Sequence, residues 1–411
     1  MERVLVWARL RDVIQTAIRF RRRLVCRVTA TAVTGLSTWF GPVNRAAAQC
    51  EGTWVKLNPG ANPTSYLGHA MAYDAGRNET VLFGGYGNGM NLNETWEWNG
   101  SDWNKRFAVT MPVPLDSHAM AYDSARGVTV LFGGRNVNGP LGDTWEWNGT
   151  NWSFRTPSNS PSVRGDHAMA FDSARGVAVI FGGLTTGSMY SDETWEWNGT
   201  NWSQKSSVDH PSARYGHAMA FDDVRGVTVL FGGRTAGGIE DETWEWNGTN
   251  WSQRFPVNHP SRRNGHGMAF DRSEGVTTLF GGADLMGTFA DTWSWNGTDW
   301  SVHQPASAAS ANSGVRLAYD TDRRVITLFG NAGGGVHALD TWEWSVPKLA
   351  ISQQPAAQTI GVGQTGVLSV IAAGPAPLSY HWRMNGSALS DGGAISGTAT
   401  ATLIINTAAV R

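Results

Sequence analysis

The chain has 411 residues, of which 16% are charged, and its 32 basic and 34 acidic side chains give a formal net charge of −2. This balance gives no indication of the strongly basic surface on which electrostatic nucleic-acid binding depends. Only two cysteines occur, Cys26 and Cys50, so a disulfide-rich scaffold and a cysteine-rich zinc site are excluded as well. The 50 glycines and 21 tryptophans exceed ordinary usage and indicate many turns and aromatic strands.

Residues 1–48 have the order of a bacterial-type leader segment. Five arginines between residues 19 and 27 precede a modestly apolar run from Val28 to Phe40, and Ala46-Ala47-Ala48 follows. This order predicts a signal peptide cleaved before Gln49, and hence a secreted or cell-surface protein. The apolar run is too short to span ~30 Å of hydrocarbon, which disfavours a membrane anchor. A lipoprotein attached through Cys50 is disfavoured because Gln49 stands where a small residue is expected.

A repeat of 49 or 50 residues organises the chain from about residue 53 to residue 344. One tryptophan series steps by 49, 49, 50, 49 and 49 residues: Trp54, Trp103, Trp152, Trp202, Trp251 and Trp300. A phenylalanine series has the same steps: Phe83, Phe132, Phe181, Phe231, Phe280 and Phe329. No helical pattern separates the copies, and repeats of this length built from strands are typical of a β-propeller.

Each copy predicts four short strands. In the first copy these are residues 68–73, which alternate in character, the apolar run Val81–Phe83 ended by two glycines, and Thr95–Trp98. Asn99-Gly100 then predicts a tight hairpin turn, after which Trp103 begins the fourth strand.

These units resemble kelch repeats, as in the galactose oxidase central domain. The resemblance rests on the histidine of the first strand, the apolar strand ending in Gly-Gly, the acid-Thr-Trp third strand and the tryptophan that follows. It implies an all-β fold, a six-bladed kelch-type β-propeller. No tryptophan follows soon after Asp340–Trp344 in the sixth copy, so Thr53-Trp54-Val55 is expected to supply the missing strand and close the ring.

The sixth copy departs from the repeat. It reads Gly314-Val315-Arg316 where the fifth copy reads Gly265-His266-Gly267, and its Gly-Gly has become Gly330-Asn331. We expect the seam of the ring at this copy, because closure relaxes the constraints on the repeat.

Residues 348–411 resemble a bacterial immunoglobulin-like domain. Tyr380-His381-Trp382 is followed by Asn385-Gly386 and by the apolar strand Ala401–Ile405. The resemblance implies that Trp382 is buried and that this is an incomplete Ig-like β-sandwich, since the fold needs ~100 residues. We therefore predict a leader at 1–48, a propeller at 49–347 and a partial Ig-like domain at 348–411, within a longer multidomain protein.

Two recurring polar residues are candidate ligands or catalysts. The histidines of the first strands are candidate metal ligands: His69, His118, His167, His217 and His266. One imidazole per blade spreads them too widely for one ion, so we favour hydrogen bonding between blades. The third-strand glutamates recur too regularly for an asymmetric catalytic pair: Glu97, Glu146, Glu196, Glu245 and Glu343. No catalytic residue, metal site or cofactor is predicted.

Two classes of loop vary between the copies. They follow the second strand, as at residues 86–93, 135–142, 184–192, 234–241, 283–290 and 332–339, or precede the first strand. In an up-and-down blade both classes emerge on one rim. Their changing aromatic and arginine residues form the predicted binding surface: Tyr86, Arg135, Tyr190, Tyr215, Arg234 and Phe289. Drift of unselected loops is the alternative.

The function predicted is that of an exported, non-enzymatic binding module that recognises a protein or polysaccharide, with no transmembrane helix in the propeller. A structural spacer within a large cell-surface adhesin is the alternative. A copper-radical oxidase similar to galactose oxidase is disfavoured, because both cysteines lie outside the repeats and no Cys-Tyr cross-link can form there. A sialidase-like enzyme is disfavoured because no Ser-x-Asp-x-Gly-x-x-Trp box occurs.

Overall fold

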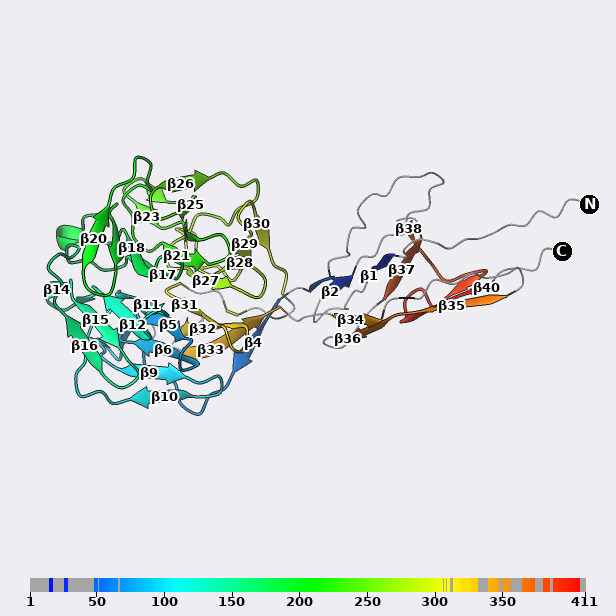
Figure 1. Cartoon of the computed structure of the whole chain (residues 1–411), viewed down its shortest axis with the longest axis horizontal. Coiled ribbons are helices and arrows are strands. Elements are labelled where there is room, and N and C mark those ends of the chain that lie inside the picture. The colour runs from blue at the N-terminus through cyan, green and yellow to red at the C-terminus, as the bar shows by residue number, and fades with distance from the viewer. Residues whose placement is uncertain are drawn as a thin grey trace, which may run out of the picture. The chain divides into compact units, whose positions relative to one another are not determined.

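The computed structural model describes residues 15–17, 26–28, 48–50, 52–65, 67–305, 307, 309–310, 313–331, 339–346, 350–353, 355, 364–373, 380–384 and 387–406. The chain divides into two compact units, which are described separately (Figure 1). The repeat domain comprises Trp54–His303 and Ala308–Ser345, and the terminal unit comprises Met1–Thr53, Gln304–Ser307 and Val346–Arg411. Within the described ranges, no helix has the length and apolar character needed to cross a membrane.

Six four-stranded antiparallel sheets make up the described part of the repeat domain, and we number them 1 to 6 along the chain. Sheet 1 consists of β5 (Ala70–Asp74), β6 (Glu79–Phe83), β9 (Thr95–Trp98) and β10 (Trp103–Arg106). Sheet 2 consists of β11 (Ala119–Asp123), β12 (Val128–Phe132), β15 (Thr144–Trp147) and β16 (Trp152–Arg155). Sheet 3 consists of β17 (Ala168–Asp172), β18 (Val177–Phe181), β19 (Thr194–Trp197) and β20 (Trp202–Lys205). Sheet 4 consists of β21 (Ala218–Asp222), β22 (Val227–Phe231), β25 (Thr243–Trp246) and β26 (Trp251–Arg254). Sheet 5 consists of β27 (Gly267–Asp271), β28 (Val276–Phe280), β29 (Thr292–Trp295) and β30 (Trp300–Val302). Sheet 6 consists of β31 (Arg316–Asp320), β32 (Val325–Asn331), β33 (Leu339–Ser345) and β4 (Thr53–Leu57).

The first strands of the sheets contact one another in a closed cycle, from β5 through β11, β17, β21, β27 and β31 back to β5 (Figure 1). Repeated four-stranded sheets whose innermost strands surround a common axis are the arrangement of a β-propeller. The strand β4 is the fourth strand of sheet 6 and lies beside β33, although the two come from opposite ends of the repeat region.

A tryptophan–threonine hydrogen bond joins each pair of neighbouring sheets. The buried indole of the fourth strand donates to the threonine that begins the third strand of the preceding sheet, at 2.8 to 2.9 Å. The six pairs are Trp103–Thr341, Trp152–Thr95, Trp202–Thr144, Trp251–Thr194, Trp300–Thr243 and Trp54–Thr292. Trp54 on β4 therefore occupies the same position as the other fourth-strand tryptophans.

The Gly-Gly pairs make room for the first-strand histidines. A Cβ on Gly133 would lie 3.0 Å from Cε1 of His167 in the next sheet, and one on Gly134 would lie 2.9 Å from Cβ of His118 in its own sheet. Both glycines have positive φ, 67° and 98°. Histidine and Gly-Gly therefore form one packing arrangement, and sheet 6 changes both together, with Val315 for histidine and Asn331 for the second glycine.

The first-strand histidines pack between sheets. Each imidazole contacts the second-strand phenylalanine of the preceding sheet, with ring centroids 5.4 to 5.6 Å apart. Nε2 of His69 also lies 3.3 Å from the Phe329 carbonyl oxygen. Burial lowers the pKa of the other four histidines, and a hydrogen bond to the backbone of the corresponding phenylalanine opposes this shift. Aromatic packing thus accompanies the expected hydrogen bonding between sheets. No cluster of three or more His, Cys, Asp or Glu side chains in the described ranges has the geometry of a metal site.

The third-strand glutamates neutralise buried charge. Glu97 is fully buried and accepts from Arg77 and Arg106 of its own sheet, each at 2.5 Å, and from the indole of Trp147 in the next sheet at 2.9 Å. The corresponding partners recur around Glu146, Glu196 and Glu245. A carboxylate with this set of partners holds two sheets together.

The terminal unit contains small antiparallel sheets. Its strands are β1 (Gln15–Ala17), β2 (Cys26–Val28), β3 (Ala48–Cys50), β34 (Ala350–Gln353), β35 (Thr365–Ser369), β36 (Ile371–Ala373), β37 (His381–Met384), β38 (Ser387–Ala388), β39 (Ile395–Ser396) and β40 (Thr402–Asn406). Trp382 is fully buried with Leu368, Val370 and Leu403, and its indole donates to the Thr400 carbonyl at 2.9 Å. Apart from β1 to β3, the predicted leader lies outside the described residues, as does the predicted Asn385-Gly386 turn.

Substitution of Trp54 tests how much β4 contributes to the ring. Trp54→Ala should lower the free energy of unfolding of the repeat domain by about 3–5 kcal/mol, because the side chain is fully buried against Phe280 and Trp344 and donates to Thr292. Val55→Ala in the same strand is the control, since Val55 is 49% exposed. Denaturant unfolding measures both. Equal stability of the two variants would show that β4 does not hold the ring.

Acidification should destabilise the repeat domain through the buried histidines. Burial, followed by the nearby Arg164, lowers the pKa of His167 to about 3, whereas an unfolded histidine titrates near 6.5. On acidification the unfolded state binds the proton first, so the free energy of unfolding falls below pH 6.5 and is unaffected above it. One such histidine accounts for about 2 kcal/mol of lost stability at pH 5.

His167→Val should therefore reduce the stability lost between pH 7.5 and pH 5 by about 2 kcal/mol, as measured by urea unfolding at both pH values. Valine is the residue that sheet 6 has at this position, Val315. His259→Val, which removes an exposed imidazole, is the control and should leave the pH dependence unchanged. An unchanged pH dependence in His167→Val would contradict the argument.

Candidate functional site

The two variable loop classes are paired with each other within each sheet. Backbone bridges join the loop before the first strand to the loop after the second strand: Leu67 with Tyr86, Asp116 with Arg135, Gly165 with Leu184, Tyr215 with Arg234 and Asn264 with Ala283. In three sheets the second loop is itself a short hairpin, β7 (Tyr86–Gly87) with β8 (Met90–Asn91), β13 (Arg135–Asn136) with β14 (Gly139–Pro140), and β23 (Arg234–Thr235) with β24 (Gly238–Ile239). We call these paired loops of sheets 1 to 5 the variable-loop rim. Most of the sixth such loop, residues 332–338, lies outside the described residues.

Four of the six predicted binding residues come together over sheets 2 to 4. Tyr190 and Tyr215 have ring centroids 5.3 Å apart, and Tyr215 exchanges backbone hydrogen bonds with Arg234. Arg135 of sheet 2 also interacts electrostatically with Tyr215. These residues were far apart in the sequence, and the packing of neighbouring sheets makes them one surface.

Two carboxylates hold Arg135 in place. Its Nε lies 3.0 Å from Oδ1 of Asp116, and its Nη1 lies 3.3 Å from Oδ2 of Asp166 in the next sheet. Burial alone would lower the pKa of Arg135, but Asp166 and Asp116 outweigh it and raise that pKa. The side chain is still 47% exposed, so a fixed guanidinium faces the solvent.

The other two predicted residues have contacts within their own sheets. Tyr86 is partly buried in sheet 1, where it pairs with Leu67. Phe289 packs against the guanidinium of Arg263, whose Cζ lies 4.2 Å from the centroid of the phenylalanine ring. Arg263 is fully buried and forms an ion pair with Asp291. The ring of Phe289 therefore covers a structural ion pair.

Sequence reasoning missed Asp116 and Asp166, and for Asp166 a signal was available. The residue before the first strand's histidine is glycine in sheets 1, 4 and 5, and each of these glycines has a positive φ. Asp166 takes that place in sheet 3 and also has a positive φ, 56°. A non-glycine residue held in this conformation is uncommon and marks a position worth attention.

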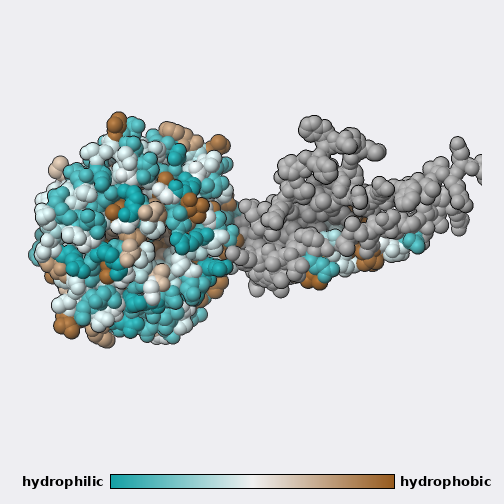
Figure 2. Space-filling view, in the orientation of Figure 1, coloured by the Kyte–Doolittle hydropathy of each residue, from teal (hydrophilic) through white to brown (hydrophobic). Residues whose placement is uncertain are grey.

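The residues that precede the first-strand histidines, together with Gly314 in sheet 6, form an inner ring of backbone hydrogen bonds on this rim. Each amide donates to the carbonyl of the preceding sheet at 2.7 to 2.9 Å, from Ser117 to Gly68, Asp166 to Ser117, Gly216 to Asp166, Gly265 to Gly216 and Gly314 to Gly265. The inner ring fixes the loops around the axis, so the exposed side chains of the rim are mounted on a rigid frame. On the face visible in Figure 2, the surface is mixed and largely hydrophilic, with hydrophobic residues scattered over it.

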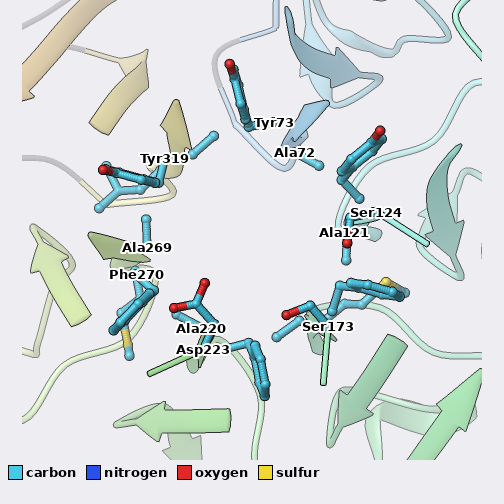
Figure 3. A pocket seen from close by; sticks show the side chains of 18 of the residues that line it. Ala72, Tyr73, Ala121, Ser124, Ser173, Ala220, Asp223, Ala269, Phe270 and Tyr319 are labelled. Atoms are coloured by element: carbon cyan, nitrogen blue, oxygen red, sulfur yellow. The ribbon is translucent and has the colours of Figure 1, made fainter. Parts of the chain in front are cut away.

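A cavity of about 360 Å³ lies at the opposite ends of the first strands (Figure 3). Every sheet contributes the same positions: small alanines such as Ala72 and Ala220, aromatic rings, and the residue that follows the aspartate at the strand's end. The rings are Tyr73, Tyr122, Phe171, Phe221, Phe270 and Tyr319, and the last position is occupied by Ala75, Ser124, Ser173, Asp223, Arg272 and Thr321.

The aromatic ring and the residue after the aspartate both differ between sheets. Tyrosines occupy sheets 6, 1 and 2, and phenylalanines occupy sheets 3, 4 and 5. The hydroxyls of Tyr122 and Tyr319 accept from backbone amides of the preceding sheet at 3.1 Å. Burial, then Asp320 of the preceding sheet, raises the pKa of Tyr73 to about 12. The tyrosines therefore fasten sheets together, while aromatic walls and an Asp223–Arg272 ion pair suit a small ligand with an apolar face.

No family model matches this chain, and no curated protein matches it. Among solved structures, the chain is similar to the one titled "Structure of YjhT", a kelch-type propeller, at 15% sequence identity and a TM-score of 0.55. The match covers 72% of this chain and 97% of that chain. At this identity the likeness concerns the fold alone: this chain has an all-β fold of repeated four-stranded antiparallel sheets with the character of a β-propeller.

Proposed function

We propose that the repeat domain is a six-bladed kelch-type propeller, completed by β4, and that it is an exported, non-enzymatic module which binds a protein or polysaccharide through the variable-loop rim. The closed cycle of first strands and the six tryptophan–threonine hydrogen bonds support the six-bladed ring. The order of residues 1–48 supports export, and the buried Trp382 supports a partial Ig-like domain at 348–411.

The observation that carries the binding role is the cluster of Arg135, Tyr190, Tyr215 and Arg234 on three consecutive sheets. Arginine and tyrosine are the side chains most often found as binding anchors, because they offer a rigid donor fork and a large contact area. Arg135 is already fixed by two carboxylates, so little of its freedom remains to be lost when a ligand binds.

The environment of the recurring glutamates supports a non-enzymatic role. General acid–base catalysis needs a carboxyl group that reaches a substrate. Glu97 is fully buried, accepts from two arginines, and is shielded by the indole of the next sheet. The structural spacer remains the alternative, and a measured ligand distinguishes it from the binding module.

Alanine substitution on the variable-loop rim tests the proposal. Binding by the full chain is first found on a glycan array or by pull-down and then measured with the purified ligand. Arg135→Ala and Tyr190→Ala should each weaken binding, by about 1 kcal/mol or more for the dominant residue. Binding is compared at a temperature where each variant is fully folded, because Arg135→Ala also removes the ion pairs with Asp116 and Asp166. Thr150→Ala is the control, since Thr150 is exposed on an Asn-Gly-Thr turn of the opposite face. Arg126 is unsuitable, because it neutralises the buried Glu146.

The axial cavity is a second candidate site, favoured by its aromatic walls and its volume of about 360 Å³. Ser173→Phe places a ring at its mouth, where Ser173 is exposed. If the ligand binds at the variable-loop rim, Ser173→Phe should leave the affinity unchanged. Loss of binding in Ser173→Phe with full binding in Arg135→Ala would reverse the assignment of the face.

A further inference from the structure

The first residue of each first strand is small in sheets 1 to 5 and is an arginine in sheet 6. The small residues are Ala70, Ala119, Ala168, Ala218 and Gly267. Arg316 takes this place at the start of β31. That end of the strand adjoins Gly314 of the inner ring, whereas Tyr319, near the other end, lines the axial cavity. Arg316 therefore belongs to the variable-loop side of the axis.

Arg316 begins the innermost strand of sheet 6, which contacts β27 and β5 around the axis. It acts electrostatically on His69, His118 and His266 of sheets 1, 2 and 5, and on Asp166 of sheet 3. A group in sheet 6 that influences four other sheets is close to the centre of the ring. Arg316 is also only partly exposed, and burial lowers its pKa.

No carboxylate of the described residues forms an ion pair with Arg316. Its hydrogen bond is from Nη1 to the carbonyl of its neighbour Val315, at 3.0 Å. Asp166, the carboxylate that acts on it electrostatically, is 3.3 Å from Arg135. The surrounding imidazoles are neutral because burial lowers their pKa values, so they supply no negative charge.

A charge that is partly withdrawn from water and has no carboxylate partner costs the folded protein some stability. The repeat itself shows that packing does not require the arginine, because alanine occupies the same place in four sheets. Residues that cost stability in this way are retained where function needs them. An anion from outside the chain would supply the partner that the described residues do not provide.

We infer that Arg316 is an anion-binding residue, and that the ligand of the variable-loop rim carries a carboxylate, sulfate or phosphate group that enters the axis and pairs with its guanidinium. This rests on the proposed function and adds the chemical class of the ligand. A planar guanidinium matches an oxyanion with two parallel hydrogen bonds. Four of the six residues of the inner ring are glycines, which present no side chain to an entering group.

Thermal unfolding of the full chain tests this inference with two probes, acetate and inorganic phosphate, each titrated at fixed ionic strength against chloride. At least one probe should raise the melting temperature of the unsubstituted protein, because a ligand that binds only the folded state stabilises it. Arg316→Ala, which installs the residue of the other sheets, should abolish this rise. In chloride alone it should melt at a higher temperature than the unsubstituted protein, since an unpaired charge is gone.

Arg262→Ala is the matched control, because it removes an exposed arginine of the same rim and should keep the response to the probe. An equal response in Arg316→Ala would mean an adventitious ion only, and would overturn the inference. A lack of response to both probes, or a lower melting temperature of Arg316→Ala in chloride, would also overturn it, the latter by showing a structural role.

The failure of the proposed function has a different signature. If Arg135→Ala and Tyr190→Ala leave the macromolecular ligand bound, the variable-loop rim is not the recognition surface. The response of the melting temperature to phosphate or acetate, and its loss in Arg316→Ala, would still stand in that case.

Discussion

The hydrogen bond from a fourth-strand indole to a third-strand threonine is the interaction on which the rest of the repeat domain depends. A four-stranded sheet has two faces to cover, and this bond fixes how each sheet lies on its neighbour. Its donor and acceptor are buried, so losing one partner leaves a polar group without a hydrogen bond, which costs about 1–3 kcal/mol. The pair Trp54–Thr292 extends the same rule to a strand from the other end of the repeat region, which ties closure of the ring to one buried side chain.

The unusual composition follows from the same sheet-to-sheet geometry. The inner strands approach closely, so Gly133 faces His167 of the next sheet, and a Cβ there would lie 3.0 Å from the imidazole. Further out, Glu97 receives two arginines from its own sheet and Trp147 from the next. Histidines and glutamates that suggest metal binding or catalysis in isolation are therefore explained here by contacts between sheets. Positions that break the repeat are the more informative ones for function.

The period of the repeat was enough to predict the strands and the place of Thr53-Trp54-Val55, because each copy is a local strand-and-turn pattern reinforced by its neighbours. It also predicted that the variable loops share a rim, which follows from strand direction. It was not enough to predict what each loop residue contacts. Asp166 meets Arg135 from another sheet, and Phe289 covers the buried Arg263, because those distances depend on the tilt and spacing of sheets. The axial cavity escaped prediction for the same reason, since it is assembled from single residues of six sheets.

The departures around sheets 5 and 6 separate structure from function. In sheets 1 to 4 and 6, the arginine of the first turn lies against the hairpin glycine of the next sheet, as Arg77 lies against Gly149. Sheet 5 has Glu274 at the position of this arginine. The third and fourth strands of sheet 6, the next sheet, come from opposite ends of the repeat region, so no hairpin joins them and sheet 6 has no hairpin glycine for an arginine of sheet 5 to contact. In sheet 6, Val315 replaces the histidine and Asn331 replaces the second glycine of the Gly-Gly pair. The two replacements occur together because that glycine is needed only where the histidine of the same sheet packs against it. Arg316 has no such counterpart, since alanine satisfies the packing elsewhere. A ring built from nearly equivalent sheets acquires a distinct chemistry on its axis only where one copy differs without a structural reason, and Arg316 is such a place.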